Sequence, residues 1–138
     1  MIVADTGAIV ALIDADDRHH SALRALFEEE PEMWLLPWAI LPEVDYLVGK
    51  FIGSQAEEAF LFDLSRGLYR VVWGEAIDLK RANELALRYR DLKLGLVDSI
   101  VMAVAERLKA HTIATVDERH FAAVSIRGEP RLVPRDLT

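Results

Sequence analysis

Short apolar runs alternate with amphipathic segments along most of the chain, and this alternation limits the folds that the chain can adopt. The runs contain β-branched and aromatic residues, which favours strands. The segments between them carry apolar residues three or four positions apart, which favours helices. Strands separated by helices form βαβ units and a parallel sheet with helices on its faces, so an α/β fold is predicted. The runs lie at residues 2–4, 33–37, 69–73 and 112–116, with a shorter one at 132–133.

The expected helices have recognisable ends. Asp16 or Asp17 is expected to cap one of them, and Pro42 fits the first turn of another, where its missing N–H costs little. Ser54 and Glu57 have the spacing of a capping box, and Gly67 lies beyond the helix that they open. A loop is expected at residues 91–95. The expected helices cover residues 8–14, a segment around 23–27, and residues 40–51, 54–66, 79–89 and 97–108.

The composition excludes several classes of protein. The chain has 138 residues, of which 52% are hydrophobic, so one domain covering residues 1–138 is expected. It contains no cysteine, which excludes disulfides, zinc–thiolate sites and thiol catalysis. The first apolar run has no basic flank and is interrupted by Asp5, and no run reaches the roughly 20 apolar residues of a membrane span. A cytoplasmic protein is therefore expected.

Acidic residues follow two of the predicted strands and lie in the first turns of two predicted helices. Asp5 follows the first strand and Asp117 follows the fourth, and ligands of open parallel sheets bind at the carboxyl ends of the strands. Glu43 and Asp98 lie beside the apolar stripes of their helices rather than opposite them. Each acid taken singly could be a helix cap, a first-turn acid or a turn residue. Four acids brought together without a basic partner would repel one another, so a bound cation is expected among them.

Carboxylate oxygens select hard cations, meaning Mg²⁺, Mn²⁺ or Ca²⁺. Mg²⁺ usually engages substrate phosphates, which suits phosphodiester hydrolysis. The formal net charge of −7 argues against simple non-specific binding of nucleic acid, but bound cations would offset a carboxylate cluster locally. Thr6, Ser99 and Thr115 place hydroxyl groups beside the acids, where they orient either a carboxylate or the local backbone. The four histidines form no metal-ligand pattern, since His111 and His120 each stand alone.

Four segments of the chain resemble the PIN-domain family and, within it, the VapC-type toxins of prokaryotic toxin–antitoxin pairs. The segments are IVADTGAIVAL, LLPWAILPEVDYLV, LGLVDSIVMAVAERL and TIATVDERHF, in the family order. This resemblance implies a three-layer α/β/α sandwich around a short central parallel sheet, and endoribonuclease activity that depends on Mg²⁺ or Mn²⁺. Asp5, Glu43, Asp98 and Asp117 match the family's acidic quartet, the metal ligands and catalytic acids, while Thr6 and Thr115 match hydroxyl positions beside its first and last Asp.

The resemblance also implies partners. It implies an RNA substrate, a homodimer and a small antitoxin of the VapB type, whose extended segment covers apolar surface and brings a basic side chain to the acids. Asp98 is the only central acid of its helix, where some relatives carry a second, and Asp91 is expected in the preceding loop, which leaves a second metal open. The expected apolar surface consists of Leu23, Leu26, Phe27, Phe51 and Phe62.

Other interpretations remain open. Asp5-Thr6-Gly7-Ala8 also resembles the signature of retroviral-type aspartic proteases, which need an almost all-β chain. A phosphate-accepting receiver domain would need a Lys after its last strand, and no Lys follows Lys109. A PIN fold could also process RNA without an antitoxin, or act only as a binding module. Candidate contacts for RNA phosphates are Arg18, Lys50, Arg90, Lys93 and Arg119.

Overall fold

A five-stranded parallel sheet forms the centre of the computed structural model, which describes residues 1–137. The strand order is β3-β2-β1-β4-β5, so the chain builds outward from β1 first to one side and then to the other. The register pairs Val3 of β1 with Leu35 of β2 and with Ile113 of β4. The strands are β1 (Ile2–Ala4), β2 (Trp34–Pro37), β3 (Arg70–Val72), β4 (Thr112–Ala114) and β5 (Arg131–Val133).

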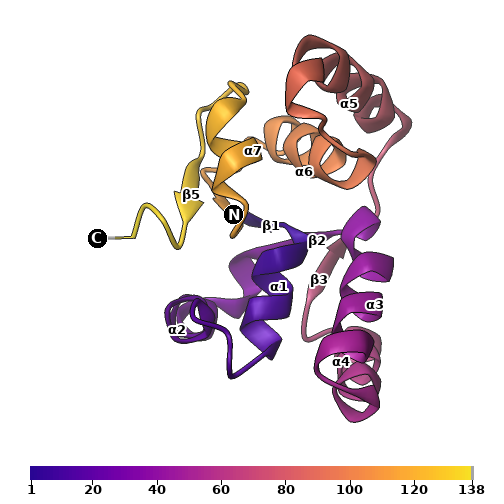
Figure 1. The fold of residues 1–138 in the computed structure, drawn as a ribbon, viewed down its shortest axis with the longest axis vertical. Helices are drawn as coiled ribbons and strands as arrows, with labels where there is room; N and C mark the ends of the chain where they lie inside the picture. The colour runs from indigo at the N-terminus through magenta and orange to yellow at the C-terminus, as the bar shows by residue number, and fades with distance from the viewer. Residues whose placement is uncertain (138) are drawn as a thin grey trace.

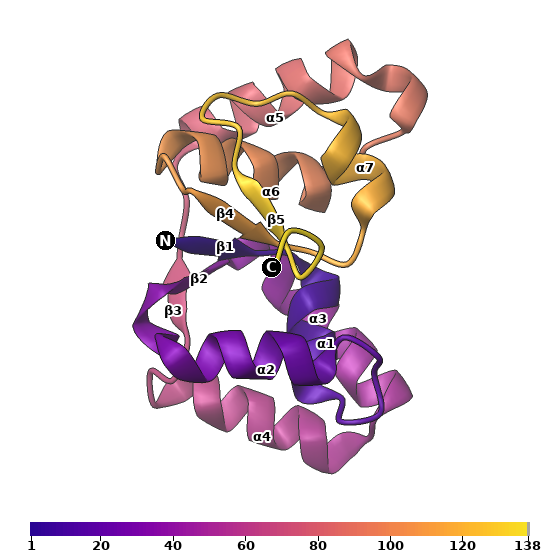
Figure 2. The ribbon, with the colours of Figure 1, turned by 90° about the vertical axis from the view of Figure 1, so that its left-hand side faces the viewer.

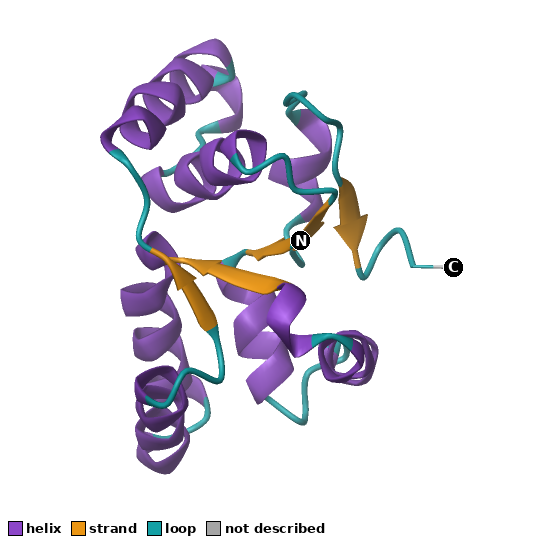
Figure 3. Cartoon of the chain, turned by 180° about the vertical axis from the view of Figure 1, so that it is seen from behind, coloured by secondary structure: helices purple, strands orange, loops and turns teal. Residues whose placement is uncertain are grey.

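Helices cover both faces of the sheet and complete three layers (Figure 1). Four helices lie below the sheet in that view: α1 (Thr6–Ile13), α2 (His20–Glu29), α3 (Leu41–Phe51) and α4 (Ser54–Ser65). Three lie above it: α5 (Ala76–Arg88), α6 (Leu96–Arg107) and α7 (Glu118–Ala123). The turned and reversed views show the same separation of the helices by the sheet (Figures 2 and 3). The predicted α/β/α sandwich is therefore confirmed.

Apolar residues from both faces of the sheet form the core. Val3, Leu36 and Ile113 of the three central strands are almost completely buried, as a parallel sheet covered on both faces requires. Helix α6 is buried continuously from Ser99 to Ala105. Among the described residues, no helix combines the length and the apolar content that crossing a bilayer requires.

All five strands and six of the helices match the sequence-based predictions to within a few residues. Pro42 lies in the first turn of α3, as predicted. The predicted loop at 91–95 is preceded by a short 3-10 helix, η3 (Arg90–Leu92), and two more such turns, η1 (Pro31–Met33) and η2 (Trp38–Ile40), flank β2.

Two predicted helix caps are wrong. Helix α2 begins at His20 with no side-chain cap, because Asp17 instead accepts a hydrogen bond from the backbone of His19. Helix α4 begins at Ser54, so the N-cap is Gly53, whose φ of 136° suits glycine, and Ser54 is already helical. The capping box of this chain lies at α5, where Glu75 and Asp78 bond each other's backbone N–H groups.

The buried face of α5 also differs from the prediction. The apolar spacing of this helix predicts one face made of Leu79, Ala82, Ala86 and Tyr89. Leu79 is nevertheless 59% exposed, while Asp78 is buried. The charge of Asp78 is tolerated there because Arg107 of α6 donates two hydrogen bonds to its carboxylate, at 2.7 and 3.0 Å. Helix α7 was not predicted at all.

Candidate active site

The central strands β1 and β4 deliver Asp5 and Thr115 to the same edge of the sheet. Asp5 directly follows β1 and is only 5% exposed, and its side chain does not cap α1, although it occupies the N-cap position. Because β1 and β4 pair in register, Thr115 lies beside it and donates a hydrogen bond from Oγ1 to Asp5 Oδ2 at 3.0 Å. Figure 2 shows β1 running from the N label toward the side of the molecule where α1 and α7 lie.

Thr115 also fixes the backbone of Asp117, the acid that follows β4. Its Oγ1 accepts a hydrogen bond from the backbone N–H of Asp117 at 3.0 Å. Asp117 is the N-cap of α7, and its Oδ1 accepts from the backbone N–H of His120 at 3.2 Å. One hydroxyl group therefore links the carboxylate of Asp5 to the backbone that carries Asp117.

His120 joins the acids and was missed by the sequence interpretation, which treated it as isolated. Its Nδ1 lies 3.0 Å from Asp98 Oδ2 and 3.0 Å from Asp117 Oδ2. Potential ligand atoms of Asp98, Asp117 and His120 all lie within 4.8 Å of one another. The available signal was the spacing of Asp117 and His120, because residues three apart share one face of a helical turn.

Glu43 lies at the rim of this cluster. It is exposed in the first turn of α3, whereas Asp98, in the first turn of α6, is half-buried. No ion pair of Glu43 is found in the part of the chain that the structure describes. Its negative charge still contributes to raising the pKa of Asp98, so its field reaches the cluster. Asp91 is exposed on η3.

Burial and the charges of neighbouring acids make Asp5 and Asp98 easier to protonate. Burial raises the pKa of Asp5 to about 6; hydrogen bonds from Thr6 and Thr115 oppose this rise, and the charges of Asp98 and Asp117 add to it. The pKa of Asp98 is also raised, mainly by burial, despite its hydrogen bond with His120. Among the described residues, no Lys or Arg forms an ion pair with these acids. The cluster therefore carries more negative charge than its surroundings offset.

Two hydroxyl groups beside the acids have no hydrogen-bond partner among residues 1–137. Thr6 Oγ1 and Ser99 Oγ are buried and unsatisfied, and each follows an acid of the cluster directly in the chain. A buried hydroxyl without a partner costs about 1–3 kcal/mol, which water or a ligand would recover. The two unsatisfied hydroxyl groups could bind the waters of a hard cation, and the carboxylate oxygens could bind the cation itself.

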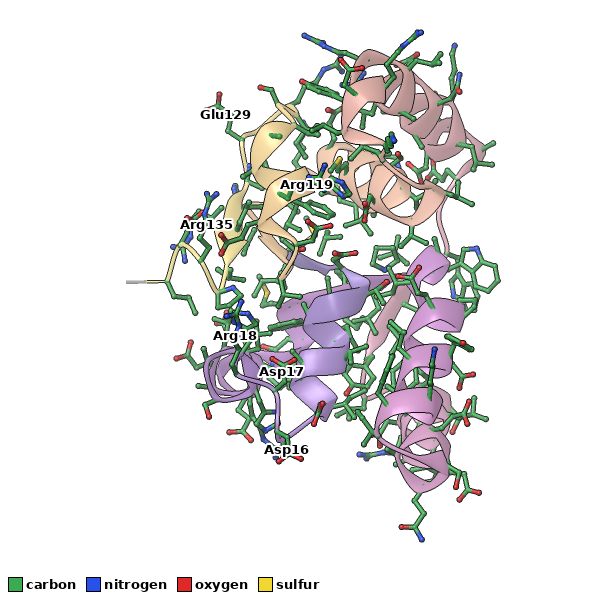
Figure 4. All side chains as sticks on the ribbon, viewed as in Figure 1. Asp16, Asp17, Arg18, Arg119, Glu129 and Arg135 are labelled. Atoms are coloured by element: carbon green, nitrogen blue, oxygen red, sulfur yellow. The ribbon has the colours of Figure 1, made fainter. Side chains whose placement is uncertain are left out.

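The candidate phosphate contacts are all exposed. Arg18, which follows α1, and Arg119 of α7 come from opposite sides of the sheet and lie on the same side of the molecule (Figure 4). Within residues 1–137, neither forms an ion pair with a carboxylate, and the same holds for Lys50, Arg90 and Lys93.

The acidic cluster lies outside the largest cavity described. That cavity, about 750 Å³, lies between α5 and α6, and none of Asp5, Glu43, Asp98 or Asp117 lines it. A smaller cleft of about 350 Å³ has walls from η2, the start of α5 and the start of α6.

Comparisons with known proteins agree with this fold. A family model described as PIN domain matches residues 2–126. Ribonuclease VapC26 of Mycobacterium tuberculosis is 29% identical over 130 residues, which cover 94% of this chain and 96% of that protein. Among solved structures, VapC20 of Mycobacterium tuberculosis, a toxin described as cleaving the sarcin–ricin loop, has a TM-score of 0.80 at 23% identity, covering 93% of this chain and 98% of its own. VapBC2 from Rickettsia felis, bound to a DNA fragment from its promoter, has a TM-score of 0.68 at 18% identity, covering 96% of this chain and 97% of its own.

Proposed function

Since the chain belongs to the PIN domain family, we propose that it is a Mg²⁺- or Mn²⁺-dependent endoribonuclease and the toxin of a toxin–antitoxin pair. In this proposal residues 1–138 form one nuclease domain that acts in the cytoplasm. The similarity to ribonuclease VapC26, over nearly the whole length of both chains, supports RNA as the substrate.

The convergence of Asp5, Asp98 and Asp117 is the observation that carries the proposal. They come from three different elements. The charges of Asp98 and Asp117 add to the rise in the pKa of Asp5, and the charge of Asp117 adds to the rise in the pKa of Asp98. Uncompensated repulsion of this kind destabilises a fold, so its presence at one edge of the sheet favours a functional role.

Asp5, Asp98, Asp117 and Glu43 are the proposed metal ligands, with oxygen donors that suit Mg²⁺ or Mn²⁺. A bound divalent cation would supply a water of lowered pKa and charge stabilisation for phosphodiester hydrolysis. The chain itself positions the donors: Thr115 fixes Asp5 and the start of α7. Thr6 is buried beside Asp5 with a free hydroxyl, which is available to orient water.

A small antitoxin of the VapB type is the proposed partner, and a homodimer is the proposed form of the toxin. Of the expected apolar surface, Phe51 is 65% exposed and Phe62 is 63% exposed, so both can contact a partner. Leu23 is fully buried, and Leu26 and Phe27 pack against the core, so that part of the prediction is wrong. A basic antitoxin side chain near Asp98 would neutralise the cluster and block the metal.

Cleavage of single-stranded RNA by the purified chain tests the nuclease. We expect cleavage with Mg²⁺ or Mn²⁺, no cleavage in EDTA, and a rate lowered by orders of magnitude in Asp5→Asn and Asp98→Asn, because each loses a charged ligand. Asp91→Asn, an exposed acid outside the cluster, should cleave like the wild type. Undiminished cutting in EDTA would overturn the metal mechanism, and RNA binding without any cleavage would indicate a binding module.

Isolation of the protein from its native host tests whether it is the toxin of a toxin–antitoxin pair. The chain should co-purify with a small protein that suppresses its cleavage of RNA. A fully active monomer without such a partner would indicate an RNA-processing nuclease instead.

A further inference from the structure

We propose that Trp38 and Trp73 form a stacking platform for an unpaired base of the RNA, beside the acidic cluster. This proposal rests on the proposed ribonuclease function, and it names a contact that would hold single-stranded substrate next to the cluster. The two indole rings are the defining feature of the 350 Å³ cleft.

The two indoles are already stacked and still open to solvent. Their ring centroids are 5.9 Å apart with an angle of 28° between the planes. Trp38 is 50% exposed and Trp73 is 70% exposed, although tryptophan is the side chain that gains most from burial. A preformed and exposed aromatic stack is what single-stranded nucleic acid binds, because every base can extend it.

The platform adjoins the elements that carry the acids. Trp38 begins η2, which runs directly into α3 and its Glu43. Leu96 and Ile100 form the opposite wall of the cleft, and they flank Asp98 in the first turns of α6. Asp98 lies two positions from each of them, on another side of the same helix, and a helix with its side chains is about 10–12 Å across. A neighbouring nucleotide of the same strand can cover that distance.

The polar groups of the cleft are already engaged. Asp78 accepts from Arg107 and from the backbone of Glu75, and Glu75 accepts from the backbone of Asp78 in return. The cleft therefore offers ring faces and few free hydrogen-bonding groups. Stacking of this kind tolerates any base, and we expect purines to bind better than pyrimidines because their rings are larger.

A second copy of this chain is the competing occupant. Leu79 and Leu96 are exposed walls of the cleft, and they would suit a protein interface as well. Two observations favour the base. The cleft has the size of a small-ligand site, and its aromatic face continues along the elements that lead to Glu43 and Asp98.

Tryptophan fluorescence tests the platform directly. The chain has three tryptophans, and Trp34 is fully buried, so quenching by a stacked base reports on Trp38 and Trp73. The probe is a short single-stranded RNA with a terminal fluorescein, in Ca²⁺ and separately in Mg²⁺. Anisotropy of the fluorescein measures binding, while indole emission measures stacking. An RNA of the same length with abasic residues keeps the phosphates and removes the bases.

We expect normal RNA to bind and quench indole emission, and abasic RNA to bind at least tenfold more weakly without quenching. Trp38→Leu and Trp73→Leu should each weaken binding about tenfold, and Trp38→Phe should restore part of it. Leu87→Ala, at an exposed apolar residue near the end of α5, should change neither signal. Circular dichroism confirms that each variant is folded.

The outcomes are distinguishable. Binding of normal RNA without quenching, or equal binding of abasic RNA, overturns the platform even if the chain cleaves RNA. No binding of RNA in either metal overturns it too. Loss of a dimer in Trp38→Leu or Trp73→Leu, seen by light scattering, would show that a second copy covers this face. Quenching without cleavage would support the stacking platform and contradict only the proposed nuclease activity.

Discussion

Asp5 is a buried carboxylate with no positive side chain paired to it in the described part of the chain. Hydrogen bonds from the backbone of Thr6 and from the hydroxyl of Thr115 do not offset its burial, since its pKa rises from 3.8 to about 6. The folded protein therefore holds the proton of Asp5 more tightly than the unfolded chain does. A pKa that differs between the two states makes the free energy of unfolding depend on pH.

The metal-free protein should therefore lose stability as the pH rises from about 4 to about 7. In this range the unfolded chain ionises Asp5 freely, while the folded chain must ionise it in a buried site. The loss from Asp5 alone is about 3 kcal/mol, because the shift is about 2 units. In EDTA, the free energy of unfolding of Asp5→Asn should fall less steeply with pH than that of the wild type. Asp16→Asn, which changes an exposed acid, should keep the steepness of the wild type. Urea unfolding at several pH values measures both, and equal slopes in wild type and Asp5→Asn would contradict the prediction.

The hydroxyl of Thr115 should matter more than that of any ordinary strand threonine. Thr115→Val keeps the shape of the side chain but leaves Asp5 Oδ2 and the N–H of Asp117 without a partner. We expect the free energy of unfolding to fall by about 1–3 kcal/mol. Thr112→Val, at the start of the strand that Thr115 follows, is the matched control and should change it by about 0.5 kcal/mol or less. Similar losses in the two variants would assign Thr115 no special role.

At the scale of residues, the sequence predicted which acids meet but not what lies between them. Asp5 and Asp117 could be placed together because both follow parallel strands, and strand ends share one edge of a sheet. His120 could not, because its position depends on α7, which the sequence did not predict. The assignment of Asp5, Glu43, Asp98 and Asp117 as metal ligands stays a prediction.

Helices α5 and α6 are joined by two ion pairs that the apolar pattern does not reveal. Arg107 bonds Asp78, and Arg81 donates two hydrogen bonds to Glu106, at 2.8 and 3.1 Å. The pattern of α5 predicted Leu79 in the core, since apolar periodicity treats every charged residue as exposed. A paired charge can take a core-facing position instead, and Leu79 then faces the cleft beside the tryptophans.

Removing Asp78 should destabilise the protein strongly. Asp78→Ala leaves Arg107 partly buried without its main partner and breaks the capping box of α5, so we expect a loss of about 3 kcal/mol. Glu28→Ala breaks the exposed pair with Arg24 and should cost about 0.5 kcal/mol or less. Thermal and urea unfolding measure both losses. A cost for Asp78→Ala as small as that of Glu28→Ala would mean that the pair does not hold the two helices together.

The shortness of α7 explains why the sequence analysis did not predict this helix. Helix α7 has six residues and one buried apolar side chain, so it carries no periodic pattern to read. It begins because Asp117 caps it and because the strand end places Asp117 there. Its existence follows from the assembled sheet rather than from its own sequence.

At the scale of the whole molecule, the alternation of short apolar runs with amphipathic segments was enough to predict a parallel sheet with a layer of helices on each face. The strand order was not predicted, since the pairing of β1 with both β2 and β4 depends on how each crossover packs. The clefts and the exposure of Trp38 and Trp73 also depend on packing, and the sequence analysis predicted neither.

Binding of metal should stabilise the whole fold through the cluster. At about 100 times its dissociation constant, Mn²⁺ should raise the free energy of unfolding of the wild type by about 2.7 kcal/mol. Asp98→Asn should gain much less, because it lacks a ligand, and Asp91→Asn should gain as much as the wild type. In EDTA, Asp98→Asn should melt no lower than the wild type, since relief of repulsion offsets the weaker bond to His120. An equal gain from Mn²⁺ in Asp98→Asn would make Asp98 structural.

The pairing of β1 with β4 also sets when the acidic cluster can come into being. Thr115 and Asp5 are 110 positions apart, and Asp117 follows them both. A ribosome must therefore add every residue up to Asp117 and His120 before the cluster has all of its members, and fragments that end earlier would lack α7. Contacts this distant also form late, because the connecting chain must first be ordered. A growing chain would thus carry no assembled cluster until these residues have left the ribosome.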